Sequence, residues 1–92
     1  TNRDLNYRDT NRFALGSESL KNTTTIFSVC GMMSDAHDQD AWYSAHAHTI
    51  DASGTYNITS GFLEQVLVCA EEHHVAVLTV KEAACRFYPV FC

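Results

Sequence analysis

The feature that most constrains this 92-residue chain is its set of four cysteines, Cys30, Cys69, Cys85 and Cys92. An even number of cysteines in so short a chain indicates disulfides rather than a metal site or a catalytic thiol. No pair has Cys-x-x-Cys spacing, which argues against a zinc ribbon and a thioredoxin-type motif. Four cysteines allow three pairings, and we favour Cys30–Cys69 with Cys85–Cys92. The sequence therefore predicts a secreted, extracellular protein.

The Cys85–Cys92 bridge requires a turn between the two cysteines. An extended segment of this length would span about 23 Å, at roughly 3.3 Å per residue, whereas bridged Cα atoms lie about 4.4 to 6.8 Å apart. Tyr88-Pro89 is the candidate turn. Extended geometry there would instead pair these two cysteines with Cys30 and Cys69.

Length and hydrophobicity indicate one small globular domain. A chain of this size buries only about 60% of its unfolded surface, so disulfides would supplement its core. Hydrophobic residues make up 46% of the chain, and no apolar run approaches the roughly 20 residues that span a bilayer. We expect a mature chain without its leader peptide, because nothing at Thr1 has a signal-peptide pattern. Two sequons, at Asn22 and Asn57, would permit glycosylation in a eukaryotic secretory pathway.

The net charge of −5 is distributed unevenly along the chain. Residues 1–22 hold four basic and three acidic side chains, whereas residues 23–92 hold two basic and eight acidic ones. Because an acidic surface repels phosphate backbones, we do not expect nucleic-acid binding by residues 23–92.

Residues 1–22 and 23–92 also differ in their hydrophobic pattern. The apolar residues of 1–22 follow neither a helical nor a strand period, so this segment is expected to be a flexible arm, with one short strand over 12–15. The arm lacks cysteines and is expected to be dispensable for folding. Residues 23–92 are expected to form the single secreted β-rich domain.

Short stretches rich in β-branched and aromatic residues, separated by turn residues, predict about six strands. The favoured fold is therefore mainly β, a small disulfide-stapled sandwich or barrel. Residues 33–40 are expected to form a turn or helix start capped by Ser34 or Asp35. The expected strands are 23–30, 42–50 and 55–59, then 62–70 and 75–80 as a hairpin, and 86–91 as an edge strand or a stapled turn.

Two stretches are ambiguous between strand and helix. Residues 41–50 would place His46 and His48 on one face only if they form a strand, and the turn chemistry of 51–54 favours a hairpin with 55–59. Residues 62–73 lack the Gly or Asn stop that a helix favours. If helices form near 36–49 and 62–73 instead, the alternative is an α+β sandwich like the subunits of killer toxins.

The order of these elements resembles that of small secreted fungal effectors of the MAX β-sandwich type. The resemblance covers residues 23–82 and rests on Ile26-Phe27-Ser28-Val29-Cys30, the segment Trp42 to Gly54, Thr55-Tyr56-Asn57-Ile58-Thr59-Ser60-Gly61 and Cys69. Cys69 lies within the fourth expected strand rather than before the fifth, and Cys85 and Cys92 are additional to the family pattern. The resemblance implies a non-enzymatic virulence protein that binds host proteins.

No catalytic, cofactor or phosphate-binding motif is present, so the expected protein is not an enzyme and carries no cofactor or metal. The predicted activity is the binding of a target or host protein by an exposed strand edge, through Trp42, Ser44, His46 and His48. Two alternatives stay open. One is a small secreted hydrolase or ribonuclease that uses histidines and carboxylates. The other is a metal-binding secreted protein or killer-toxin-like subunit.

Overall fold

Helices carry most of the regular structure in residues 5–11 and 15–92, the part of the chain that the computed structural model describes. The helices are α1 (Ile26–Asp38), α2 (Ser60–Glu72) and α3 (Val80–Phe87), followed by the 3-10 helix η1 (Pro89–Phe91). The described strands have two residues each: β1 (Leu5–Asn6), β2 (Glu18–Ser19), β3 (Trp42–Tyr43), β4 (Ala45–His46), β5 (Thr49–Ile50) and β6 (Asn57–Ile58). The fold is therefore a small α+β structure.

The strands form three separate pairs rather than one sheet. β1 lies antiparallel to β3, whereas β2 with β4 and β5 with β6 are parallel. No described strand has two neighbours, so neither a sandwich nor a barrel can form from them. The expected mainly β fold is wrong, and residues 51–56 form a loop between parallel strands instead of a hairpin turn.

The first helix occupies the stretch expected to be a strand over residues 23–30. Thr25 is its N-cap, and its hydroxyl accepts a hydrogen bond from the Ser28 amide. The cap therefore lies well before Ser34 and Asp35, where a helix start was expected. The buried residues of α1 recur at helical spacing and place one face toward the core: Val29, Met32, Met33 and Ala36.

The second helix replaces the first strand of the hairpin expected over residues 62–80. Thr59 caps α2 by accepting a hydrogen bond from the Phe62 amide, and Cys69 and Ala70 are buried on its inner face. The alternative fold had a helix over 62–73, close to α2. Its other helix, over 36–49, is absent, because α1 ends at Asp38 and β3 to β5 follow.

The third helix begins within the stretch 75–80, which was expected to be a strand. Residues 75–79 have no regular structure, and Thr79 and Glu82 form a capping box that starts α3. Residues 86–91 end α3 and continue into η1, so this stretch is a turn rather than an edge strand. The Cys85–Cys92 disulfide staples that turn.

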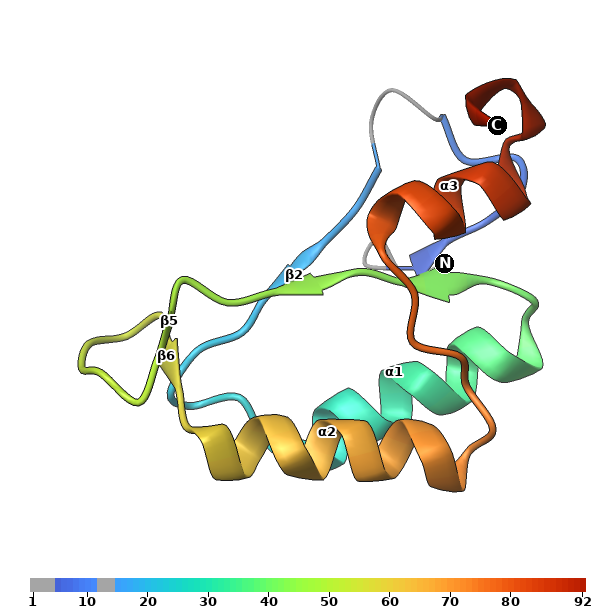
Figure 1. The fold of residues 1–92 in the computed structure, drawn as a ribbon. Coiled ribbons are helices and arrows are strands. Elements are labelled where there is room, and N and C mark those ends of the chain that lie inside the picture. The colour runs from blue at the N-terminus through green and yellow to red at the C-terminus, as the bar shows by residue number, and fades with distance from the viewer. Residues whose placement is uncertain (1–4, 12–14) are drawn as a thin grey trace.

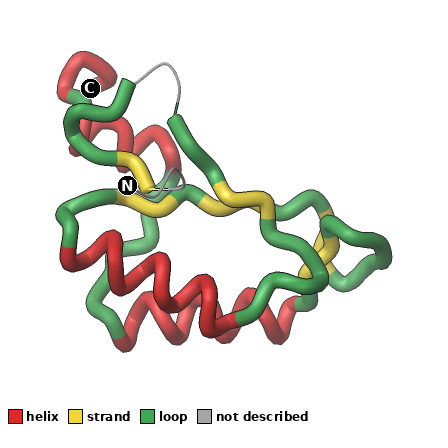
Figure 2. The backbone as a smooth tube through the Cα atoms, turned by 180° about the vertical axis from the view of Figure 1, so that it is seen from behind, coloured by secondary structure: helices red, strands yellow, loops and turns green. Residues whose placement is uncertain are grey.

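Helices α1 and α2 lie side by side and run in the same direction (Figure 1). The short strands and their connections pass along one side of this helix pair, and α3 lies near β1 and β3, next to the C-terminus (Figures 1 and 2). The main core lies between the two layers. It consists of Leu20, Val29, Met33, Ile58, Cys69 and Ala70.

The described part of residues 1–22 is packed into the fold. Leu5 is only 3% exposed and contacts a second apolar cluster with Met32 and Ala36. Asn6 is fully buried, donates a hydrogen bond to the Gly16 carbonyl and accepts one from the Gly16 amide. The described part of this segment thus contributes buried side chains to the fold. Most of the short strand expected over 12–15 lies outside the described residues.

Candidate functional site

Two disulfides are present, and their pairing is the one that the sequence favoured. Cys30–Cys69 joins the middle of α1 to the last turns of α2, across 39 residues of sequence. Cys85–Cys92 closes the short C-terminal turn. The first of these bonds fixes the spacing of the two parallel helices, which in turn shapes the surface beside it.

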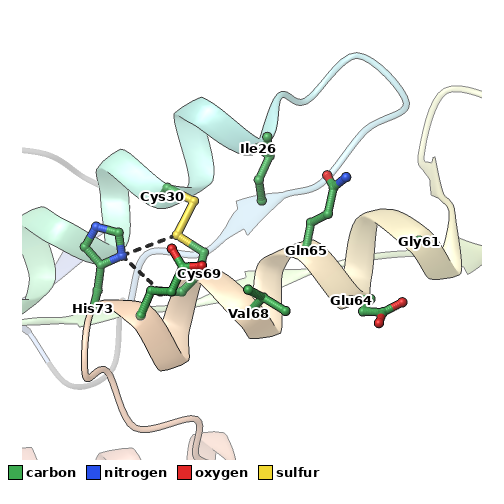
Figure 3. A pocket seen from close by; sticks show the side chains of 9 residues that line it. Ile26, Cys30, Gly61, Glu64, Gln65, Val68, Cys69 and His73 are labelled. Carbon is green, nitrogen blue, oxygen red and sulfur yellow. Dashed lines mark hydrogen bonds between the residues drawn. A yellow bond between two sulfur atoms is a disulfide. The ribbon is translucent and has the colours of Figure 1, made fainter.

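An open groove of about 530 Å³ lies between α1 and α2 beside the Cys30–Cys69 disulfide (Figure 3). Ile26 from α1 and Val68 from α2 supply apolar surface, and the bridged Cys30 and Cys69 also line the groove. Glu64 and Glu72 supply carboxylates. The groove therefore combines an apolar, covalently braced centre with negative charge.

The spacing of the α2 residues explains this arrangement. Glu64, Val68 and Glu72 follow one another at intervals of four, which places them on one face of a helix. Eight residues of helix separate the carboxylates by about 12 Å along the axis. Val68 lies between them and is 46% exposed, although α2 buries other apolar residues. The face of α2 that lines the groove thus presents one apolar side chain between two carboxylates.

His73, which ends α2, lies at the Cys69 end of the groove (Figure 3). Its Nδ1 is 3.0 Å from the backbone oxygen of Cys69 and 3.5 Å from the Cys69 Sγ. Because a carbonyl oxygen can only accept, Nδ1 carries the hydrogen of the ring. An N–H donor therefore lies beside one sulfur of the disulfide.

The four binding residues expected from sequence are divided between two places. Ser44, His46 and His48 lie on one surface, where the His46 and His48 rings are 5.8 Å apart and Tyr56 is 5.0 Å from His48. Trp42 instead packs near Phe87 on α3, with 6.3 Å between ring centroids. Its indole nitrogen is buried without a hydrogen-bond partner in the described part of the chain. Trp42 is therefore a packing residue.

Ser17 joins the histidine surface, which we define as Ser17, Ser44, His46, His48 and Tyr56. The Ser17 Oγ lies 2.8 Å from His46 Nδ1, and the Ser44 hydroxyl donates to Ser17 at 3.2 Å. A serine hydrolase needs a serine in hydrogen-bond contact with a histidine, and it also needs a third group that orients the imidazole. The hydrogen bonds found among the described residues include none from His46 to a carboxylate.

Neither resolved pKa shift belongs to the groove or to the histidine surface. The Ser60 amide and hydroxyl lower the pKa of Asp51 by hydrogen bonding to its carboxylate. Hydrogen bonds from the Thr79 amide and hydroxyl likewise lower the pKa of Glu82. Both carboxylates contact helix starts, so these shifts report on capping.

Residues 5–11 and 15–92 include no group of three or more histidine, cysteine or acidic side chains that could hold a metal ion. Within the same ranges, no helix combines the length and the hydrophobicity needed to cross a membrane.

The two sequons differ sharply in accessibility. Asn22 is exposed at a turn before α1. Asn57 is 8% exposed, and its Oδ1 accepts hydrogen bonds from the Thr49 hydroxyl and the Ala52 amide. Only Asn22 is therefore accessible in the folded protein.

Sequence reasoning missed the groove because residues 62–70 were interpreted as a strand. The four-residue spacing of Glu64, Val68 and Glu72 was a visible helical signal, whereas the approach of α1 could not be seen without the fold. Ser17 was missed because 29 residues separate it from His46. No protein-family model matches the chain, and comparison with curated proteins and with solved structures finds no match either.

Proposed function

We propose that this protein is a secreted, non-enzymatic binding protein whose α1–α2 groove takes an apolar side chain flanked by basic groups on a partner protein. The observation that carries the proposal is the placement of Val68 between Glu64 and Glu72, opposite Ile26. An apolar anchor in a groove with charges at its rim is the arrangement that protein interfaces favour.

The charge of the protein selects the partner. With a net charge of −5, the chain attracts basic surfaces over a distance set by ionic strength. Glu64 and Glu72 are exposed, so each contact with Lys or Arg contributes only about 0.2 to 1 kcal/mol. Charge therefore orients the partner, and burial of apolar surface supplies most of the affinity.

Phe27 is an exposed apolar side chain at the start of α1. It follows the groove residue Ile26 and is 88% exposed, which is the largest exposure among the big apolar side chains of the described residues. Exposed apolar surface of this kind is typical of interaction sites. Because successive helix residues point about 100° apart, Phe27 lies outside the groove and would be covered only by a partner that also contacts the adjacent face of α1.

Secretion is supported by the two disulfides, since such bonds persist in oxidising compartments. An effector or toxin-like role with a host or target protein as partner stays a prediction. The β-sandwich implied by the resemblance to MAX effectors is absent from the described residues, so that role now rests on secretion and binding alone.

A peptide selection with matched variants tests the proposal. Peptides displayed on phage are selected on the immobilised protein, and enrichment of an apolar residue flanked by Lys or Arg is expected. Val68→Glu should then weaken the selected peptide at least about tenfold, because it buries a carboxylate against an apolar side chain. Leu67→Glu is the control, since Leu67 is 47% exposed on the same helix but does not line the groove.

Two further variants test the contribution of the groove carboxylates. The double variant Glu64→Lys/Glu72→Lys should weaken binding and reverse its salt dependence, whereas Glu71→Lys on the same helix should have a small effect. The proposal is abandoned if selected peptides are not basic, or if Leu67→Glu and Val68→Glu affect binding equally.

The histidine surface supports a second candidate function, a small serine hydrolase. The specific observation is the 2.8 Å contact between Ser17 and His46. Labelling with a fluorophosphonate probe tests it, and the adduct should map to Ser17 and disappear in His46→Ala. Absence of labelling at Ser17 rules this candidate out.

A further inference from the structure

We infer that the Cys30–Cys69 disulfide undergoes exchange with a thiol presented in the groove, with Cys30 as the attacked sulfur and Cys69 as the leaving sulfur. The chemical class of the ligand is a thiol, either a small molecule or a cysteine side chain. The inference stands apart from the proposed peptide binding, because it depends on the sulfur environment and not on Val68 or the carboxylates.

Cys30 and Cys69 differ in their exposure to solvent. Both line the groove, but Cys69 is only 4% exposed, whereas Cys30 is partly exposed on α1 (Figure 3). A thiol that enters the groove therefore meets Cys30 more readily. Attack on one sulfur of a disulfide makes the other sulfur the leaving group.

His73 favours the same direction of reaction. Its Nδ1–H donates to the Cys69 carbonyl at 3.0 Å and lies 3.5 Å from Cys69 Sγ, as the dashed lines in Figure 3 show. A donor at this position can turn to the sulfur as negative charge develops there. Hydrogen bonds to charged acceptors are stronger than those to neutral ones, so the stabilisation grows as Cys69 departs.

The position of Cys69 in α2 disfavours a thiolate there, and the His73 donor counteracts this effect. Cys69 lies in the last turns of the helix, where the unpaired carbonyls and the helix dipole disfavour negative charge. An adjacent N–H offsets this unfavourable field. No second donor to Cys69 Sγ is found among the described residues.

The exchange step balances without an added oxidant. The incoming thiol loses its proton to water, and its thiolate attacks Cys30 Sγ. A new sulfur–sulfur bond forms to Cys30, and the Cys30–Cys69 bond breaks. The bonding electron pair leaves with Cys69 as its thiolate, which receives the His73 hydrogen bond. The product is a mixed disulfide at Cys30, and attack by Cys69 on that bond restores the original protein and releases the thiol.

The second disulfide provides an internal comparison. Cys92 is exposed, so Cys85–Cys92 is also accessible, but its Cys92 Sγ lies 3.1 Å from the Cys85 carbonyl oxygen. An acceptor beside a sulfur opposes the development of a thiolate. The Cys92 sulfur thus has an acceptor beside it, whereas the Cys69 sulfur has an imidazole donor beside it.

Exchange with cysteamine, a small thiol, tests the inference on the full chain. The folded protein is treated briefly, quenched with acid, alkylated with N-ethylmaleimide and mapped by peptide mass. Cysteamine should be found on Cys30 and the alkylating reagent on Cys69. His73→Ala should slow formation of this adduct about fivefold, the size expected when a charge-assisted hydrogen bond is half formed in the transition state.

Two further variants separate the donor from general stability. His73→Gln retains a side-chain N–H and should recover part of the rate, and His74→Asn should react like the unmodified protein. Asparagine suits the positive φ of 55° at position 74. A variant that merely loosened the helix would expose the disulfide and exchange faster, so the sign of the change identifies the cause.

Three outcomes overturn the inference. Cysteamine found mainly on Cys69 would reverse the assigned roles of the sulfurs. An unchanged or increased rate in His73→Ala would remove the role of the imidazole. Adducts at Cys85 or Cys92 with none at Cys30, while the protein stays folded by circular dichroism, would show that the groove does not admit a thiol.

Discussion

The hydroxyl of Tyr88 donates a 2.7 Å hydrogen bond to the backbone carbonyl of Tyr7, a residue 81 positions earlier in the chain. Tyr88 is buried, and the neighbouring guanidinium of Arg8 lies 4.6 Å above the Phe87 ring. Arg8 also forms an exposed ion pair with Asp40. These contacts join both ends of the described chain to the residues that follow α1.

Deleting residues 1–22 should abolish cooperative folding. The deletion removes Leu5 and Leu20 from the core, and loss of one buried leucine commonly costs about 2 to 5 kcal/mol, against a total stability of about 5 to 15 kcal/mol. Thermal unfolding followed by near-ultraviolet circular dichroism would check this. A truncated protein with an unchanged midpoint would restore the dispensable arm expected from sequence.

The two disulfides should contribute unequally to stability. Loop-closure entropy predicts a loss of about 4 kcal/mol for Cys30→Ser/Cys69→Ser and about 2.5 kcal/mol for Cys85→Ser/Cys92→Ser. The difference follows from sequence separations of 39 and 7 residues. Urea titrations of both double variants measure it. Equal losses, or a larger loss at the C-terminus, would contradict the loop-length argument.

Thr25→Ala and Thr59→Ala should each destabilise the protein by about 1 kcal/mol, because each removes the N-cap hydrogen bond of a helix. For a domain of this size, this corresponds to a fall of about 4 to 8 °C in the thermal midpoint. Thr23→Ala is the matched control, since Thr23 is exposed and precedes both caps. An effect at Thr23 as large as at Thr25 would argue against the cap assignment.

Stability should fall in acid, partly through two capping carboxylates. Hydrogen bonds lower the pKa of Asp51 below its ordinary value of 3.8 and that of Glu82 below 4.5. The unfolded chain therefore binds these protons more readily. Their stabilising contribution is complete above the ordinary values and is lost as the pH falls through the folded ones.

The urea midpoint at pH 6 and pH 3 measures this loss. The Asp51→Asn/Glu82→Gln double variant should lose less stability over this interval than the unmodified protein. Glu71→Gln, at an exposed carboxylate on α2, serves as the control. The capping explanation fails if the double variant and the control have the same acid sensitivity.

Expression in a eukaryotic secretory host should yield a folded protein with one N-glycan, at Asn22. A glycan on Asn57 would require space around a side chain that is 8% exposed and holds two hydrogen bonds. Peptide N-glycosidase should therefore remove one glycan mass, and Asn22→Gln should abolish the shift. A glycan mapped to Asn57 in folded, secreted protein would contradict the burial of that residue.

The disulfide pairing was predictable because it depended on spacing and on one available turn. The helices were mispredicted because β-branched residues dominated the local signal. Thr23, Thr24 and Thr25 favour a strand by propensity, yet Thr25 serves as a cap and the apolar residues after it recur at helical spacing. Similarly, Thr79 and Glu82 already formed a capping-box pattern within a valine-rich stretch.

The candidate site was harder to predict because it depends on tertiary contacts. The groove exists only where α1 and α2 meet, and no local pattern places Ile26 opposite Val68. Likewise, the sequence placed His46 and His48 together through strand alternation, but Ser17 reaches them only through the pairing of β2 with β4. The local pattern therefore predicted which side chains of one segment share a face. Which other segment packs against that face could be seen only in the folded structure.

The Cys30–Cys69 bond affects what a protease can do to the folded protein. Its two ends lie on either side of the loop 51–56, every residue of which is exposed. Exposed loops are the preferred sites of proteolytic cleavage. A single cut in this loop would leave two fragments still covalently joined, with α1 and α2 held together and the groove between them intact. The groove would therefore outlast a cut in the backbone of this loop.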